Sequence, residues 1–206
     1  MGIAYSALGW GFGMAFGVWE WRYFVKLPLP EGPLPLEGKR EDLYFPAGDS
    51  LGLKLRNGRG GLEVKRRQQI GETAAAELWS KSIHQGCLTA DGQLDVESCA
   101  HQLGVDPEEL APSGQTWPPV RVRKQRRHTE LGEEVECLFL AERADGSVLA
   151  ERYLSVSVES MRLEEVLRVT REPRKVKLPD GAIIAGYPQM VQCIAERARA
   201  APDELK

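Results

Sequence analysis

The sequence predicts an α+β fold that is mostly β: an antiparallel tunnel-like β-barrel with a few flanking helices. Three observations predict it. Strand patterns outnumber helix patterns, the strands come in hairpin pairs, and they alternate apolar with charged residues. The chain has 206 residues, 42% of them hydrophobic. This hydrophobic fraction is enough for one core, and the chain is too short for two domains of ordinary size. Residues 19–206 are therefore predicted to form a single domain.

Residues 1–18 are predicted to be a leader, disordered or loosely packed. The segment lacks the positively charged start and the clear cleavage site of a secretory signal. Its several glycines make a poor membrane helix, and the apolar run barely reaches spanning length. A membrane anchor is the alternative.

The first strands are predicted over 19–26, 51–56 and 61–67. The first of these runs is aromatic and β-branched, and the other two alternate apolar with charged side chains. Asn57-Gly58 lies between the second and third runs, and this dipeptide tolerates the positive φ angles of a tight turn. The two runs are therefore predicted to form a hairpin.

Strand patterns return in the second half of the chain, over 120–127, 133–142 and 147–159. Asp145-Gly146 joins the last two runs and is the strongest hairpin signal in the sequence.

Helices are predicted in two places. The segment 72–103 is rich in helix formers at its start and places apolar residues on one helical surface at its end, which predicts two short helices. An amphipathic helix is predicted over 187–200, beginning just before Pro188.

The strand runs repeat one design, an apolar face opposite a face that mixes bases with acids. Residues two apart on a strand share a face. The polar faces hold these sets: Lys54 with Arg56; Glu63 with Lys65 and Arg67; Glu134 with Glu136; and Ser155, Ser157 and Glu159.

Charged faces turned into a barrel would form an electropositive tunnel with an acidic strip. Unpaired bases repel one another there, so a polyphosphate-like anion would stabilise them, with Arg supplying a planar fork and Lys a point charge. Carboxylates beside phosphates would serve to hold Mg²⁺ or Mn²⁺. The alternative is a half-exposed sheet whose charged face is wet, as in a protein-interaction module.

The overall composition limits the partners. A formal net charge of −3 argues against general nucleic-acid or anionic-membrane binding, so we expect a triphosphate-containing small molecule and neither nucleic acid nor membrane. The four cysteines form no CxxC pair and no zinc spacing with the three histidines. They indicate free thiols in the reducing cytoplasm.

Taken together, WEWRYFVK, Asp42-Leu43-Tyr44-Phe45, LGLKLR, LEVKRR, VRVRKQRR, EEVECLFL and SVSVES resemble the CYTH superfamily, the triphosphate tunnel metalloenzymes. The motifs occur in the family's order over most of residues 19–160. The resemblance implies an eight-stranded antiparallel tunnel and Mg²⁺- or Mn²⁺-dependent hydrolysis of an organic or inorganic triphosphate.

The resemblance also implies roles for individual residues. The anion-binding candidates are Arg22, Lys54, Arg56, Lys65, Arg67, Lys124 and Arg126. The metal-ligand candidates are Glu20, Glu63, Glu134, Glu136 and Glu159. No catalytic base is placed by spacing.

The sequence departs from the family at three points. Arg22 stands where the first strand usually has its second acid, and Ser157 replaces an acid of the late pair. These losses favour a second hypothesis, a non-catalytic polyphosphate- or nucleotide-binding module of the same fold. In 120–127, Lys124 falls on the same face as Val122, so a β-bulge would be needed to set the valines and the lysine on opposite faces.

Overall fold

The structure is a computed structural model of the chain, and it describes residues 17–29, 31, 40–58, 60–71, 76–111, 117–129, 132–171 and 178–200. Residues 1–16 of the predicted leader lie outside the described residues, and the first strand begins at Val18.

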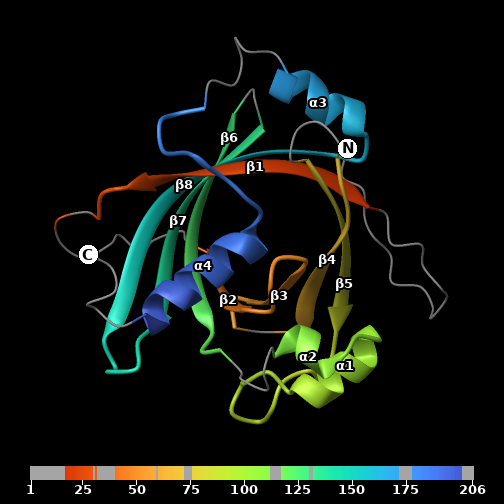
Figure 1. Cartoon of the computed structure of the whole chain (residues 1–206), viewed down its shortest axis with the longest axis vertical. Coiled ribbons are helices and arrows are strands. Elements are labelled where there is room, and N and C mark those ends of the chain that lie inside the picture. The colour runs from red at the N-terminus through yellow and green to blue at the C-terminus, as the bar shows by residue number, and fades with distance from the viewer. Residues whose placement is uncertain are drawn as a thin grey trace.

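Eight strands form a closed antiparallel barrel (Figure 1). They are β1 (Val18–Leu27), β2 (Arg40–Phe45), β3 (Leu51–Arg56), β4 (Leu62–Ile70), β5 (Glu77–His84), β6 (Val120–Thr129), β7 (Gly132–Glu142) and β8 (Val148–Ser160). Around the barrel the order is β5-β4-β3-β2-β6-β7-β8-β1, and β1 pairs with β5 to close the circle. The predicted mostly-β barrel is confirmed.

The closing strand β5 corrects one prediction. Residues 72–85 were expected to be helical, yet Glu77–His84 is a strand paired with β4 and, over its first residues, with β1. Local helix propensity is a weak preference, and pairing with strands on both sides overrides it. The second predicted helix of this segment is confirmed as α1 (Val96–Leu103), which Asp95 caps.

The barrel closes over a short distance only. β1 and β5 pair at three positions, from Val18 to Glu20, and then separate. Further along β1, the short strand β9 (Ile183–Ile184) pairs with Tyr23 and Phe24 on the edge that β5 has left. The barrel wall is therefore interrupted between β1 and β5.

The hairpin predictions are confirmed. Asn57 and Gly58 adopt φ angles of 52° and 64° between β3 and β4, the left-handed conformation that asparagine and glycine tolerate better than other residues. Gly146 has φ 78° in the turn between β7 and β8.

Helices cover the outside of the barrel at two places. The outer apolar face of β3 and β4 packs under α1 and α2 (Pro107–Leu110), in a cluster that includes Leu53, Leu62 and Leu110. α3 (Leu163–Arg171) places Val166 against Trp21 and Tyr23 of β1. None of the helices in the described part of the chain is long and apolar enough to cross a membrane.

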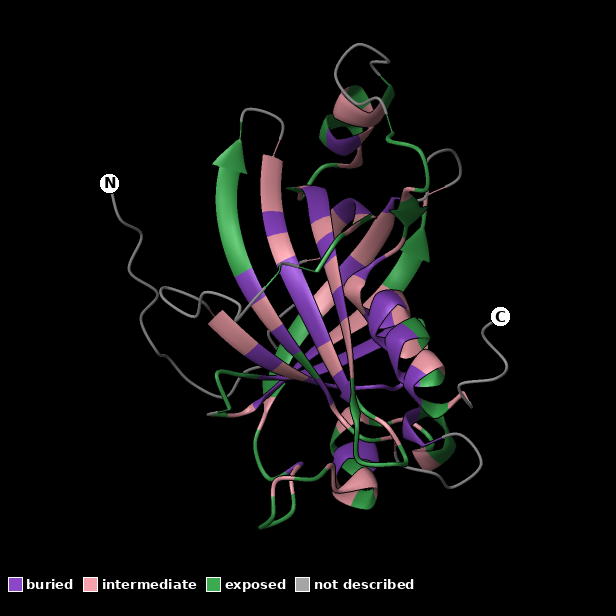
Figure 2. Cartoon of the chain, turned by 90° about the vertical axis from the view of Figure 1, so that its left-hand side faces the viewer, coloured by how far each residue is buried: buried purple, intermediate pink, exposed green. Residues whose placement is uncertain are grey.

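The fourth helix, α4 (Tyr187–Arg199), packs on the inner face of the barrel instead. Its Met190 and Ile194 contact a cluster that contains Phe24, Phe139 and Tyr153, which point inward from β1, β7 and β8. The helix predicted over 187–200 is thus confirmed, and it fills one part of the barrel with an apolar core. Figure 2 shows the buried positions along the middle of the strands and the exposed end of β6.

β6 needs no bulge. Its pairing with β2 and β7 is regular, and Val120, Val122 and Lys124 all lie buried on the inner face. The inner face changes from apolar to charged along the same strand, because the apolar half packs against α4. A register shift occurs in β4 instead, between Arg67 and Gln69.

We expect Ile194→Ala to destabilise the protein by about 2–5 kcal/mol, because Ile194 is fully buried between α4 and the barrel. Ile83, on β5, is 65% exposed, and Ile83→Ala should change stability by less than about 0.5 kcal/mol. Urea unfolding at neutral pH measures both. Equal stabilities of the two variants would contradict the packing of α4 inside the barrel.

Candidate functional site: a cation-lined cavity in the barrel

A cavity that opens to solvent lies inside the barrel at the end not filled by the core of α4, and its empty space is about 430 Å³ when the solvent at its mouth is included. Six basic side chains line it: Arg22, Arg40, Lys54, Lys65, Lys124 and Arg126. Among the residues that the structure describes, Glu159 is the one acidic residue of its lining. Tyr44, Gly52, Tyr187 and Pro188 complete the wall.

Strand alternation brings these side chains together. Five of them come from β4, β3, β2 and β6, which are neighbours around the barrel, and Arg22 comes from β1. Each basic residue occupies an inward position, as the pairing of Arg40 with Lys124 illustrates. Gly52 allows the first turn of α4 to approach, since a Cβ there would lie 3.0 Å from the ring of Pro188. The cavity is thus walled by strands and by the start of α4.

The first ion-pair cluster centres on Glu20. Arg22 Nε lies 2.7 Å from one carboxylate oxygen and Lys65 Nζ lies 2.9 Å from the other. Burial alone would raise the pKa of Glu20, but the attraction of Arg22 and Lys65 outweighs it and holds the pKa well below its usual range. Arg22 also donates to Ser155 Oγ, at 2.6 Å, and to Glu159, at 3.2 Å.

The second cluster centres on Asp42, which is fully buried. Arg40 donates to its carboxylate at 2.5 Å, and Lys124 Nζ lies 3.3 Å away. Burial would raise the pKa of Asp42, yet the Arg40 hydrogen bonds and the charges of Lys124 and Lys54 lower it. Asp42 therefore stays ionised among more cations than one carboxylate can neutralise.

Lys54 connects this cluster to Glu63, which it contacts at 2.6 Å. Arg56 and Lys81 contact the other oxygen of Glu63, at 2.8 and 3.0 Å. Burial lowers the pKa of Lys54 to about 8, against the opposing attraction of Glu63. The pKa of Glu63 is about 2, because these bases outweigh the effect of burial.

Lys124 lies against aromatic rings as well as against Asp42. Its Nζ lies 3.6 Å from the centre of the Tyr187 ring and donates to Tyr44 Oη at 2.5 Å. The two tyrosine rings stack, with centres 5.7 Å apart, and Arg22 lies over the Tyr187 ring at 4.6 Å. Burial, together with the positive charge of Lys54, lowers the pKa of Lys124 well below its ordinary value.

Five of the seven predicted anion-binding residues line this cavity: Arg22, Lys54, Lys65, Lys124 and Arg126. The other two point inward but are held by acids beside it, Arg56 by Glu63 and Arg67 by Glu77, the latter at 2.7 Å. Their predicted role in binding stays a prediction.

The predicted metal ligands do not converge. Glu134 and Glu136 lie on the outer face of β7, opposite Val156 and Leu154, and Glu136 contacts Arg152 at 3.0 Å. Their inward placement was expected from the charged faces of neighbouring strands. At β7 the inner face is apolar because it packs against α4, so the acids face outward.

The remaining three candidates lie on the inner face but are engaged by bases. Both oxygens of Glu20 and of Glu63 contact Lys or Arg, and Glu159 contacts Arg22. Within the described ranges, no group of three or more His, Cys, Asp or Glu side chains is arranged to hold a metal ion. This arrangement does not fit a divalent ion held by protein carboxylates alone.

Sequence reasoning missed Arg40, Asp42 as a buried anion, and the two stacked tyrosines. The alternation of Arg40, Asp42 and Tyr44 on a short strand was a usable signal. Tyr187 gave none, because it comes from a helix distant in sequence.

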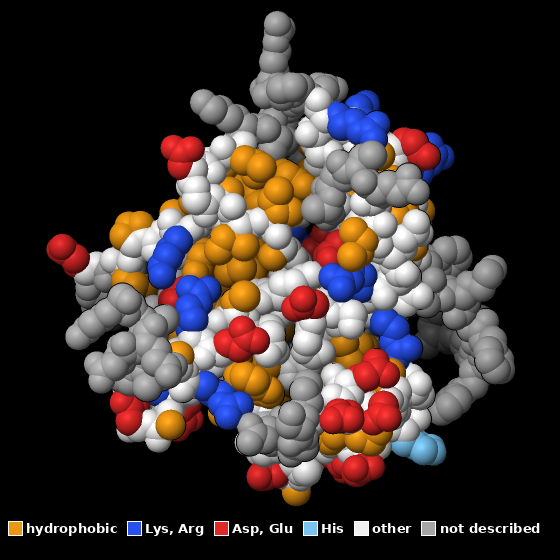
Figure 3. Space-filling view, in the orientation of Figure 1, with side chains coloured by type: hydrophobic (Ala, Val, Ile, Leu, Met, Phe, Trp, Pro, Cys, Tyr) orange, Lys and Arg blue, Asp and Glu red, His pale blue; other side chains and the backbone are white. Residues whose placement is uncertain are grey.

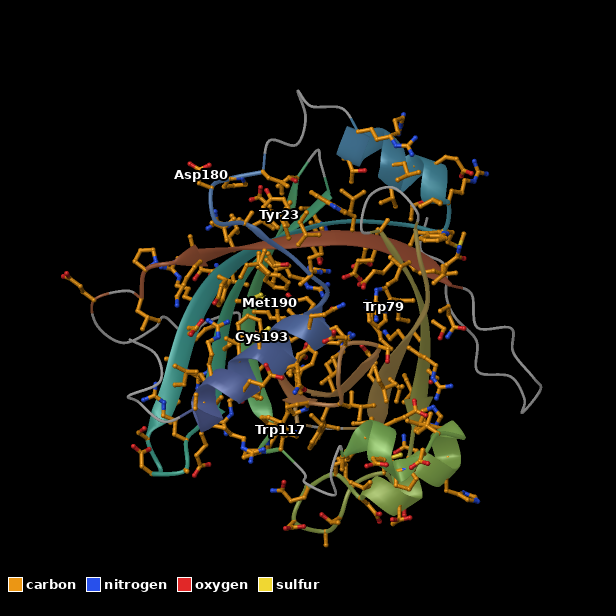
Figure 4. The ribbon with its side chains drawn as sticks, in the orientation of Figure 1. Tyr23, Trp79, Trp117, Asp180, Met190 and Cys193 are labelled. Atoms are coloured by element: carbon orange, nitrogen blue, oxygen red, sulfur yellow. The ribbon has the colours of Figure 1, made fainter. Side chains whose placement is uncertain are left out.

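Figure 4 shows Trp79 on the inner side of β5, across from α4 with Met190.

No family model matches the chain, and no curated protein matches it. Among solved structures, it is similar to a protein from Bacillus halodurans described as a "putative adenylate cyclase". The TM-score is 0.33, with 12% sequence identity, and the match covers 69% of this chain and 79% of that chain. A likeness at this level carries no argument, so the barrel and its cavity rest on the geometry above.

The depressed pKa of Glu63 predicts a contribution to acid stability. Above its ordinary value of 4.5 the carboxylate stabilises the folded state, and this stabilisation is lost as pH falls toward about 2. In Glu63→Gln, stability should therefore fall less steeply over this window. Urea unfolding between about pH 5 and pH 2 measures it. Glu142→Gln, which removes an exposed carboxylate at the end of β7, is the control, and parallel curves for Glu63→Gln and wild type would contradict the assignment.

Proposed function

We propose that the barrel binds a triphosphate-containing small molecule, organic or inorganic, in the cation-lined cavity. The observation that carries the proposal is the lining itself: among the described residues, six basic side chains and the acidic Glu159 face the cavity, while the carboxylates of Glu20, Asp42 and Glu63 that pair with these bases do not line it. Arg22 and Arg40 supply planar forks for phosphate oxygens, and the lysines supply point charges. A small anion with several charged oxygens matches this distribution better than a single phosphate.

The state of the two buried lysines supports an anionic ligand. Burial and neighbouring cations depress the pKa of both Lys54 and Lys124, so each is charged at a cost. A bound polyanion would restore their ordinary basicity and offset the repulsion. The four free thiols fit a cytoplasmic setting for such a ligand.

We also propose that the chain is related to the CYTH superfamily, because its sequence contains motifs that resemble those of the superfamily. Hydrolysis with Mg²⁺ or Mn²⁺ is the family's chemistry and stays a prediction for this chain. The inner carboxylates are occupied by bases, which supports binding more than metal-dependent hydrolysis. The experiment below separates the two.

We expect tripolyphosphate to stabilise the protein against heat, by about 2.7 kcal/mol at one hundred times its dissociation constant. The samples contain Mg²⁺, Mn²⁺ or a chelator, and phosphate release is followed in each. Stabilisation that survives chelation without release defines a binding module. Stabilisation and release that both require metal define a triphosphatase.

Variants localise the effect. Lys65→Met and Arg126→Met should each weaken tripolyphosphate binding about tenfold or more, because each removes a charge-assisted contact. Arg121→Met is the matched control, since Arg121 is half exposed on the outer face of β6. Absence of stabilisation in every condition would overturn the proposal and leave the protein-interaction module.

Binding should weaken as pH rises through about 8. Lys54 has a pKa of about 8 in the free protein, and a bound polyanion favours its charged form, so binding takes up a proton near this pH. Titration calorimetry in two buffers of different ionisation enthalpy measures the uptake. Lys54→Arg stays charged throughout and should show a flatter profile, while the ligand's own titration is common to both proteins. Identical profiles would contradict the role of Lys54.

A further inference from the structure

A second cavity lies where β1 and β5 separate, with about 500 Å³ of empty space when the solvent at its mouth is included. It is bordered by the end of β4, by β9 and by the first residues of α4. Figure 3 shows this face of the molecule, with acidic and basic side chains next to each other in the hollow beside the N-terminal end of α4. Arg22 lines both this cavity and the cation-lined one, so the two adjoin.

The chemistry of this cavity differs from that of the first. Glu20 and Glu77 line it, and Arg22 is its one basic residue within the described part of the chain. Both oxygens of Glu20 are engaged by Arg22 and Lys65. The polar groups still available must therefore come from Glu77 and from α4.

Two acceptor oxygens in this cavity lack donors. Arg67 and Gln189 both contact Oε1 of Glu77, at 2.7 and 3.0 Å, and no described residue donates to its Oε2. The side-chain amide of Gln189 donates an N–H to the Glu77 carboxylate, so the amide oxygen of Gln189, Oε1, points away from that hydrogen bond. This oxygen is buried, and no partner for it is found among the described residues. An unpaired buried acceptor is costly, so Gln189 Oε1 calls for a donor, and Glu77 Oε2 is free to accept from the same group.

Both acceptors lie around Gly186, the residue that precedes α4. A Cβ at this position would lie 2.8 Å from Gln189 Oε1 and 3.1 Å from Glu77 Oε2. A side chain at this position would crowd both oxygens, so glycine is what lets them lie together beside this point of the backbone. The arrangement suits a nitrogen that donates to both at once.

The rim of the cavity is apolar. Ile70 and Ile184 line it and are 55% and 44% exposed. Exposed isoleucines at the entrance of a cavity with converging acceptors favour a ligand group that is partly apolar and ends in a donor.

We propose that the second cavity binds an amino or ammonium group of the ligand's organic part, with Glu77 Oε2 and Gln189 Oε1 as acceptors. This proposal rests on the proposed function, because the phosphates of the same ligand occupy the adjoining cation-lined cavity. The ligand class is then an organic triphosphate that carries a hydrogen-bond-donating nitrogen.

The test compares alkyl esters of triphosphate with and without a terminal amino group, in a series of chain lengths, by titration calorimetry. Inorganic tripolyphosphate is titrated in parallel. The best amino ester should bind at least about tenfold more tightly than the alkyl ester of equal length. Gly186→Ala, which crowds both acceptors, and Glu77→Gln, which removes the charge of one of them, should each reduce this ratio to near one. Because the ratio compares two esters in the same variant, a change in phosphate affinity that is common to both esters cancels.

Glu136→Gln makes the same charge change on the outer face of the barrel and should keep the full preference. Equal affinities of amino and plain esters at every length, with tripolyphosphate still binding, would overturn this inference and leave the proposed function intact. Failure of tripolyphosphate to bind would overturn both. A preference that persists in Gly186→Ala and Glu77→Gln would also overturn the inference.

Discussion

The contact set of Arg22 is the interaction on which the rest of the site depends. Its guanidinium contacts Glu20 on the same strand, Ser155 and Glu159 on β8, and the ring of Tyr187 on α4. A buried guanidinium costs several kcal/mol unless its donors are satisfied, and breaking such a pair costs about 3–5 kcal/mol. The strands and the helix that supply its partners are therefore fixed relative to one another, and both cavities form around them.

The barrel interior is divided into two halves of opposite character. On β1 the inward positions run from Glu20 and Arg22 to Phe24, and on β6 they run from Val122 to Lys124. The apolar half is filled by α4, and the charged half keeps its cavity. The apolar core supplies stability by burial, so the charged half can hold repelling bases that contribute little to it.

The N-terminal end of α4 completes both cavities. Tyr187 and Pro188 line the cation-lined cavity, and Gly186 and Gln189 line the second. A short segment near the end of the described chain thus sets the boundary between the proposed phosphate and amine sites. Because Tyr187 stacks on Tyr44 and covers Lys124, the position of the helix also controls how much of this charge a ligand reaches.

The sequence by itself determined the strand alternation, the two glycine turns and the helix after Gly186, because these follow from local periodicity and backbone preference. Five of the residues that line the cavity were predicted from motifs that resemble those of a known family. Only the tertiary structure decided which face of each strand turns inward. Glu134 and Glu136 face outward because α4 packs against the inner side of β7. Residues 77–84 form a strand because the neighbouring strands β4 and β1 hydrogen-bond with them. Alternation determines which residues share a face of a strand, but packing against a helix distant in sequence determines whether that face turns into the barrel or out of it.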